Sequence, residues 1–238
     1  MEIKRTISNK IIFVLLAVIL ATFIMGWILP VGIDKVSSLT YREYLFSTYT
    51  VFTQFGFLMF AFLVAFFINK EYSGKTILFY RMMNDTSLTF YSKKVLTLII
   101  ETVGIIFSTL LIISALFKDF SVFFQMFFLF SMVAIQYIVI VALISLLMTN
   151  ILLSIGFSLL YWILTVVFVS FGGALRLFAI FDASNELYGK VGDFLESSSV
   201  FLGTEDNLMV FIYILVIAII SMIIAKLNNQ RWLELGTR

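Results

Sequence analysis

The chain contains no cysteine and no histidine, and it has a single proline among 238 residues. The first two absences exclude a disulfide framework, a Cys/His zinc site and the usual histidine- or cysteine-based catalysis. The scarcity of proline is typical of long, mostly uninterrupted helices. Charged residues are also few, at 13% of the chain, whereas a soluble domain carries about a quarter. We therefore expect neither a soluble domain nor an enzyme, and no metal site.

Apolar side chains are abundant: 62% of the residues are hydrophobic, and 28 are phenylalanine. A helix needs about 20 apolar residues to cross roughly 30 Å of hydrocarbon. Two connections, Lys118-Asp119 and Thr149-Asn150, are so short that they indicate tight turns between antiparallel neighbours. We predict an all-α integral membrane protein, one transmembrane domain over residues 1–238, with six spans at residues 11–29, 48–68, 95–117, 120–148, 151–171 and 208–225.

The distribution of basic residues predicts the orientation, because cytoplasmic segments are enriched in Lys and Arg. Of the 16 basic residues, all but five lie in the N-terminal segment, in the loop after the second span or in the C-terminal segment. The opposite side has Lys35, Arg42, Lys118, Arg176 and Lys190. We therefore predict that both termini and the loop after the second span are cytoplasmic. The net charge of +2 says nothing by itself about nucleic acid, and we expect no nucleic-acid partner.

The loop after the second span, residues 69–93, is a charged segment with a small apolar patch inside it. Its Ser73-Gly74-Lys75-Thr76 has the look of a P-loop end, but Asn69 stands where that motif needs its first glycine, and a membrane helix replaces the required strand. We expect no nucleotide site on this chain. Residues 75–83 are predicted to form a short helix that ends at Asn84-Asp85. This helix either rests its apolar face on lipid headgroups or fits a groove on a cytoplasmic partner.

The whole layout resembles that of the permease subunits of type 2 ABC exporters, which have six spans with both ends inside. In that family an acidic residue after the second span is followed by a glycine, a Thr or Ser, an apolar stretch, and a lysine that enters the third span. The matching positions here are Glu71, Gly74, Thr76, Ile77, Leu78, Phe79, Tyr80, and Lys93 or Lys94. The family's loop often has a Pro and a Ser-Arg pair before that lysine. This chain has Met83-Asn84-Asp85-Thr86 there and its arginine earlier, at Arg81.

The resemblance implies that these loop residues, Arg81 included, dock onto a separate ABC ATPase subunit. ATP and Mg²⁺ then bind to that subunit, and this chain holds no cofactor. The resemblance also implies a homodimer or heterodimer of permeases in the lipid of a bacterial cytoplasmic membrane. Residues 1–10, with Ile3 and Ile7 on one face, correspond to the family's amphipathic connecting helix.

Glu101 is the ionisable residue placed well inside a span, some seven residues after Lys94. A carboxylate at the centre of a bilayer costs about 2.5–3.5 kcal/mol on insertion scales, and less near an interface. Two interpretations remain open. The side chain lines the transport pathway or a permease interface, or it reaches Lys93, Lys94 or trapped water near the cytoplasmic surface.

Three amides, Gln54, Gln125 and Gln136, also lie in apolar surroundings. Such groups usually form hydrogen bonds between helices, and Gln54 and Gln136 are also candidates for the pathway. On the other side of the membrane, residues 172–207 have a net charge of −4 and form either an acidic vestibule for cationic peptides or an ordinary solvated loop. By resemblance, residues 175–181 are expected to form a short re-entrant helix.

The resemblance leads us to expect that the chain is the membrane subunit of an ATP-driven ABC exporter. Its strongly apolar spans favour a hydrophobic or amphipathic substrate. A small permease of this composition resembles the permeases that move peptide antibiotics in export, immunity or resistance. The alternatives are a non-ABC carrier or a membrane scaffold. A carrier is expected to have inverted repeats and paired ionisable groups in broken spans, and neither pattern is present.

Overall fold

The computed structural model describes residues 6–196 and 202–229, and within these ranges every regular element is a helix. Six helices are long and apolar enough to cross a membrane, which confirms the predicted all-α membrane fold. In chain order the elements are α2 (Ile11–Ile28), η1 (Leu29–Ile33), α3 (Tyr41–Ser73), α4 (Ile77–Met82), α5 (Ser87–Phe117), α6 (Phe123–Met148), α7 (Ile151–Phe171), η2 (Gly173–Ala179), α8 (Glu186–Glu196) and α9 (Thr204–Leu227).

Several helices continue beyond the apolar stretches that predicted them. The helix α3 begins at Tyr41 because Thr40 and Glu43 form a capping box, in which each side chain accepts a hydrogen bond from the other residue's backbone N–H. The helix α5 begins at Ser87 for the same reason, with Thr86 and Thr89 as the reciprocal pair. Polar caps therefore extend these two helices into the membrane–water interface. A search for apolar stretches alone does not detect these added turns.

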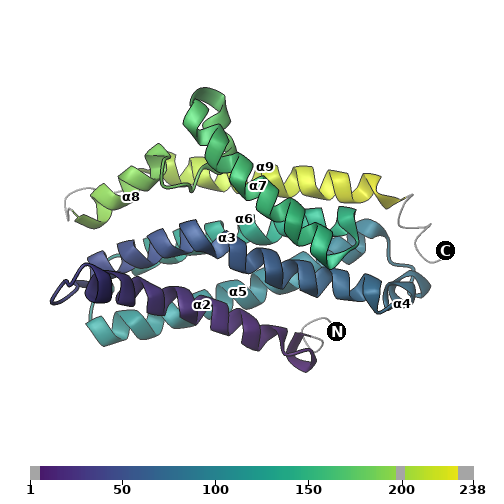
Figure 1. Ribbon diagram of the computed structural model, residues 1–238, viewed down its shortest axis with the longest axis horizontal. Helices are drawn as coiled ribbons and strands as arrows, with labels where there is room; N and C mark the ends of the chain where they lie inside the picture. The colour runs from purple at the N-terminus through teal and green to yellow at the C-terminus, as the bar shows by residue number, and fades with distance from the viewer. Residues whose placement is uncertain (1–5, 197–201, 230–238) are drawn as a thin grey trace.

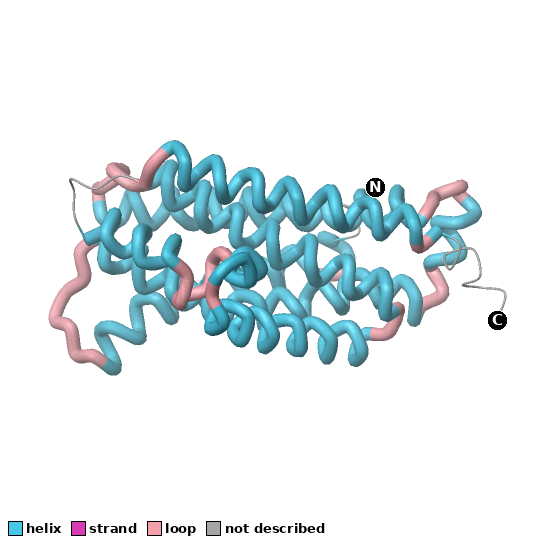
Figure 2. Tube along the Cα trace, turned by 90° about the horizontal axis from the view of Figure 1, so that it is seen from above, coloured by secondary structure: helices cyan, strands magenta, loops and turns pink. Residues whose placement is uncertain are grey.

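Two helices, α3 and α6, form the centre of the bundle. In each, 67% of the most apolar window is buried, against 39% or less in the other spans. The long helices run roughly side by side along the longest axis, and most loops gather at the two ends (Figure 2). In Figure 1, α2 and α5 lie on one side of this centre, α9 lies on the other, and α7 crosses it obliquely. The Tyr137 hydroxyl of α6 donates to the carbonyl oxygens of Phe52 and Thr53 on α3, at 3.3 and 3.1 Å.

The start of α2, the helix α4 and the end of α9 lie at the same end of the bundle (Figure 1). Lys70 Nζ donates to Asn9 Oδ1 at 3.3 Å, and the Ser87 backbone N–H donates to Asn229 Oδ1 at 3.1 Å, which joins these segments. This is the end that the basic residues predict to be cytoplasmic. The predicted amphipathic helix at residues 1–10 lies mostly outside the described residues, and only Thr6–Ser8 is helical within them.

The two tight turns are present as predicted. Lys118 and Thr149 cap α5 and α6 with φ of 55° and 57°, and this left-handed conformation reverses the chain within a few residues. The helix α6 starts at Phe123 rather than at residue 120, because residues 120–122 belong to the turn, where Asp119 Oδ1 accepts from the Ser121 N–H at 2.8 Å.

The segment between α7 and α9 differs from expectation. A 3-10 helix, η2, occupies Gly173–Ala179 where a helix over residues 175–181 was expected, and a second helix, α8, follows it. The apolar side of α8, formed by Leu187, Val191, Phe194 and Leu195, is buried against α3. Arg42 on α3 also donates to the Phe194 carbonyl oxygen at 3.3 Å. Much of this segment is therefore packed structure.

Gly26 marks the closest approach of α2 to α3. A Cβ added at Gly26 would lie 2.7 Å from Thr48 Cα, so the two backbones could not stay in place. We predict that Gly26→Ala lowers the free energy of unfolding by about 1–3 kcal/mol, as overpacking does in well-packed cores. Thermal unfolding of the purified protein in detergent checks this. Gly156→Ala on α7 is the matched control, because a Cβ there meets no atom within 4 Å, and equal melting temperatures for both variants would contradict the prediction.

Candidate functional site

The predicted short helix between the second and third spans is present as α4, Ile77–Met82. Lys75 and Asn84 flank it with φ of 54° and 61°, so the chain turns sharply on both sides. Ile77 and Tyr80 face inward and are 5% and 3% exposed, which fixes α4 against the ends of α3 and α5. The helix is therefore anchored by one face.

A buried ion pair lies beneath α4. Lys94 Nζ of α5 donates to Glu71 Oε1 of α3 at 2.6 Å, and the Lys94 side chain has no exposed surface. The hydroxyl of Thr76 donates to Glu71 Oε2, and the Tyr80 hydroxyl donates to Glu71 Oε1 at 3.5 Å. One carboxylate thus joins the last turns of α3, the start of α4 and the first turns of α5.

Aromatic rings surround the Lys94 ammonium group. Its Nζ lies 4.4 Å from the Phe67 ring centroid, 5.4 Å from that of Tyr80 and 5.8 Å from that of Phe90. Cation–π contacts of this kind strengthen when the cation is desolvated. The sequence indicates that Lys93 or Lys94 is the lysine that enters the third span, but it does not reveal Glu71 as the partner of Lys94.

The exposed face of α4 is apolar. Leu78 and Phe79 are 36% and 47% exposed, and Met82 and Met83 follow with 85% and 48%. Among the other predicted docking residues, Gly74 and Thr76 are exposed, Arg81 is half-buried, and Glu71 is buried in the ion pair. The loop therefore contains two kinds of residue: those that fix α4 to α3 and α5, and those that form its exposed apolar surface. Met82 and Met83 belong to the surface although they were not among the predicted docking residues.

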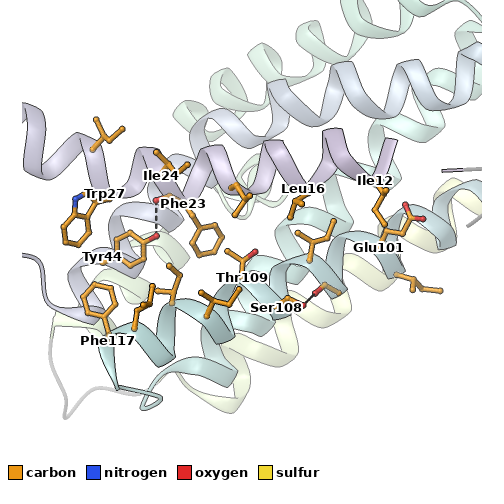
Figure 3. Close-up of a pocket in the computed structure, with 18 residues that line it drawn as sticks. Ile12, Leu16, Phe23, Ile24, Trp27, Tyr44, Glu101, Ser108, Thr109 and Phe117 are labelled. Carbon is orange, nitrogen blue, oxygen red and sulfur yellow. Dashed lines mark hydrogen bonds between the residues drawn. The ribbon is translucent and has the colours of Figure 1, made fainter. Parts of the chain in front are cut away.

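Glu101 lies on α5 at one end of an apolar groove between α2 and α5 (Figure 3). It accepts a hydrogen bond at Oε1 from the Thr6 hydroxyl, and Oε2 has no hydrogen-bond partner among the described residues. The two lysines considered as its partners are engaged elsewhere: Lys94 with Glu71, and Lys93 with Asp85 at 2.6 Å. Thr6 lies far from Glu101 in the sequence, so the sequence contained no signal for this contact.

The three glutamines have different surroundings. Gln125 donates to Asn207 Oδ1 at 2.7 Å and joins α6 to α9, as expected for an amide between helices. Gln136 is buried on α6, and its Oε1 has no hydrogen-bond partner in the described part of the chain. Gln54 is half-buried on α3. The structure does not bring Gln54 or Gln136 into the groove that contains Glu101.

Six apolar spans with a short helix at the basic end define a multi-pass membrane protein. Within residues 6–196 and 202–229, no group of three or more acidic side chains is placed to hold a metal ion. The chain belongs to the peptide export permease protein YydJ family, whose model matches residues 1–237.

A relative from Bacillus subtilis (strain 168), described as "Probable peptide export permease protein YydJ", is 43% identical over 237 residues. The match covers 99% of this chain and 99% of the relative. No solved structure matches the chain.

The adjacent lysines of α5 provide a direct test of the buried pair. We predict that Lys94→Met lowers the free energy of unfolding by about 3–5 kcal/mol, because it leaves the Glu71 carboxylate buried without its cation. Lys93→Met is the matched control: the Lys93 side chain is 46% exposed, and such ion pairs contribute about 0–1 kcal/mol. Adding Glu71→Gln to Lys94→Met should restore part of the loss. Thermal unfolding of the three variants measures this, and equal effects of Lys93→Met and Lys94→Met would contradict the prediction.

Proposed function

We propose that this chain is the membrane subunit of an ATP-driven ABC exporter that moves a hydrophobic or amphipathic peptide out of a bacterial cytoplasmic membrane. The family description and the name of the Bacillus relative support peptide export. The ATP-driven character is supported by the resemblance of the layout and of the loop after the second span to type 2 ABC permeases.

The observation that carries this proposal is the apolar surface that Leu78, Met82 and Met83 expose on α4 and directly after it. This helix lies at the predicted cytoplasmic end, beyond the apolar part of the spans. An apolar patch at such a place marks a surface for a partner. A short amphipathic helix that enters a groove on another protein is a common way of making such a contact.

The attachment of α4 suits it to transmit movement. Glu71, Thr76, Tyr80 and Lys94 connect α4 to α3 and α5 through the buried ion pair and its hydrogen bonds. A displacement of α4 by a partner therefore acts on two spans at once. In this proposal ATP and Mg²⁺ bind to the ATPase subunit, whose closure pushes on α4, and this chain holds no cofactor.

The resemblance to type 2 ABC permeases also implies a second permease, because in that family one six-span subunit does not enclose the pathway alone. We infer a homodimer or a heterodimer with a sister permease, carrying two ATPase subunits. The substrate class is a peptide antibiotic or a similar peptide, in export, immunity or resistance.

The sequence contains a matched pair of Leu-Phe dipeptides for testing the docking surface. Leu78-Phe79 lies on α4, and Leu177-Phe178 lies on η2, where both side chains are also exposed, at 56% and 51%. We predict that Leu78→Ser with Phe79→Ser lowers the amount of ATPase that co-purifies with the permease at least tenfold. The ATPase for this test is to be sought as a Walker-motif protein encoded beside the permease gene, and it is co-expressed with the permease.

The double variant Leu177→Ser with Phe178→Ser should retain the ATPase at the wild-type level. Immunoblotting of the ATPase after affinity purification of the permease measures both variants. If the wild-type permease retains no ATPase, or if both double variants retain it equally, the proposed docking is wrong.

A further inference from the structure

A second feature of interest besides α4 is a groove between α2 and α5, with a volume of about 1090 Å³. It exceeds the roughly 300–1,000 Å³ that is usual for small-molecule sites. Its lining runs from Ile12 on α2 to Ile28, a length of roughly 24 Å at the rise of an α-helix. The groove is long and lined mainly by apolar side chains, and it suits an extended apolar chain.

An aromatic cluster occupies the end away from α4. The rings of Trp27, Tyr44 and Phe117 lie within 5.5–6.4 Å of one another, and the Tyr44 hydroxyl donates to the Phe23 carbonyl oxygen at 3.0 Å (Figure 3). These side chains narrow the groove toward the predicted outer surface. A ligand therefore has access from the lipid side or from the predicted cytoplasmic end.

Glu101 supplies the only carboxyl group among the described residues that line the groove. The residue is 8% exposed, its Oε1 accepts from Thr6, and its Oε2 has no hydrogen-bond partner among the described residues. A buried carboxyl group is stabilised when a cation or hydrogen-bond donor reaches it. Beside it on α5, Gly104 leaves the wall open, since a Cβ there meets no atom within 4 Å.

We propose that this groove binds a hydrophobic peptide segment with one basic group, whose cation pairs with the Glu101 carboxyl group. The inference rests on the proposed function, since it names the chemistry of the exported peptide and the place that receives it. The apolar walls bind the body of the segment by burial of its side chains. The pairing of the peptide's cation with Glu101 fixes the direction in which the peptide lies along the groove.

The position of Glu101 favours a peptide over a membrane lipid. An acyl chain contains no group that meets a carboxyl oxygen, and a lipid phosphate is repelled by a carboxylate. Glu101 also lies roughly 10 Å along α5 from Lys94, so it is deeper than the headgroup layer. A basic side chain carried by an apolar peptide reaches this depth because the rest of the segment is stabilised by the groove walls.

The test uses two synthetic 12-residue peptides with an apolar Leu/Phe body, capped ends and a fluorophore. One has a single lysine near one end, and the other has norleucine in its place. Binding to the purified full-length permease in nanodiscs is measured by fluorescence, with empty nanodiscs subtracted. Because no ATPase is present, the result does not depend on whether the ATPase co-purifies, so the two proposals fail separately.

We expect the lysine peptide to bind the wild-type protein about tenfold more tightly than the norleucine peptide, and Glu101→Gln to abolish this preference. Gly104→Leu should weaken both peptides at least tenfold by filling the groove. Gly156→Leu is the matched control and should leave both affinities unchanged, because Gly156 is exposed on α7, away from the groove. Equal binding of both peptides to wild type, or unchanged binding to Gly104→Leu, would overturn the inference and leave lipid as the occupant.

Discussion

The ion pair between Glu71 and Lys94 determines how the loop after the second span relates to the bundle. Both groups are buried, and a buried charge is tolerated only when a partner and further hydrogen bonds compensate for lost water. Thr76 and Tyr80 provide those hydrogen bonds from α4 and from the residue before it. The short helix is thereby tied to two spans, although its own six residues form too few helical turns to be stable alone. Leu78 and Met82 are exposed on α4 because the opposite face of the helix is held in this way.

The two features with functional interest share one helix. Lys94 and Glu101 are both on α5, so the helix that anchors α4 also forms one wall of the groove. The opposite wall, α2, is joined to α3 by η1 and the segment after it, not to α5. The width of the groove therefore depends on how α5 sits against α2. The helix α5 therefore connects α4, at the predicted cytoplasmic surface, with the groove inside the membrane.

The spans, the two tight turns and α4 were predictable because they depend on local properties: apolar length, turn-forming residues and caps. The partners of Lys94 and Glu101 were not predictable, since Glu71 and Thr6 lie far from them along the chain. The inward orientation of Ile77 and Tyr80 was also hidden, because a six-residue apolar helix contains no sequence contrast that tells the packed face from the exposed one. By contrast, α8 had a readable signal in the spacing of Leu187, Val191, Phe194 and Leu195.

The central pairing of α3 with α6 has a consequence for how the protein is made. Tyr137 and its acceptor Phe52 are 85 residues apart, whereas α5, α6 and α7 follow one another through short turns. Local pairs form soon after each helix is inserted, but distant contacts wait for the later segment. The first three spans must therefore remain in lipid without the contacts that later cover α3. The centre of the protein is completed only when the fourth span enters the membrane.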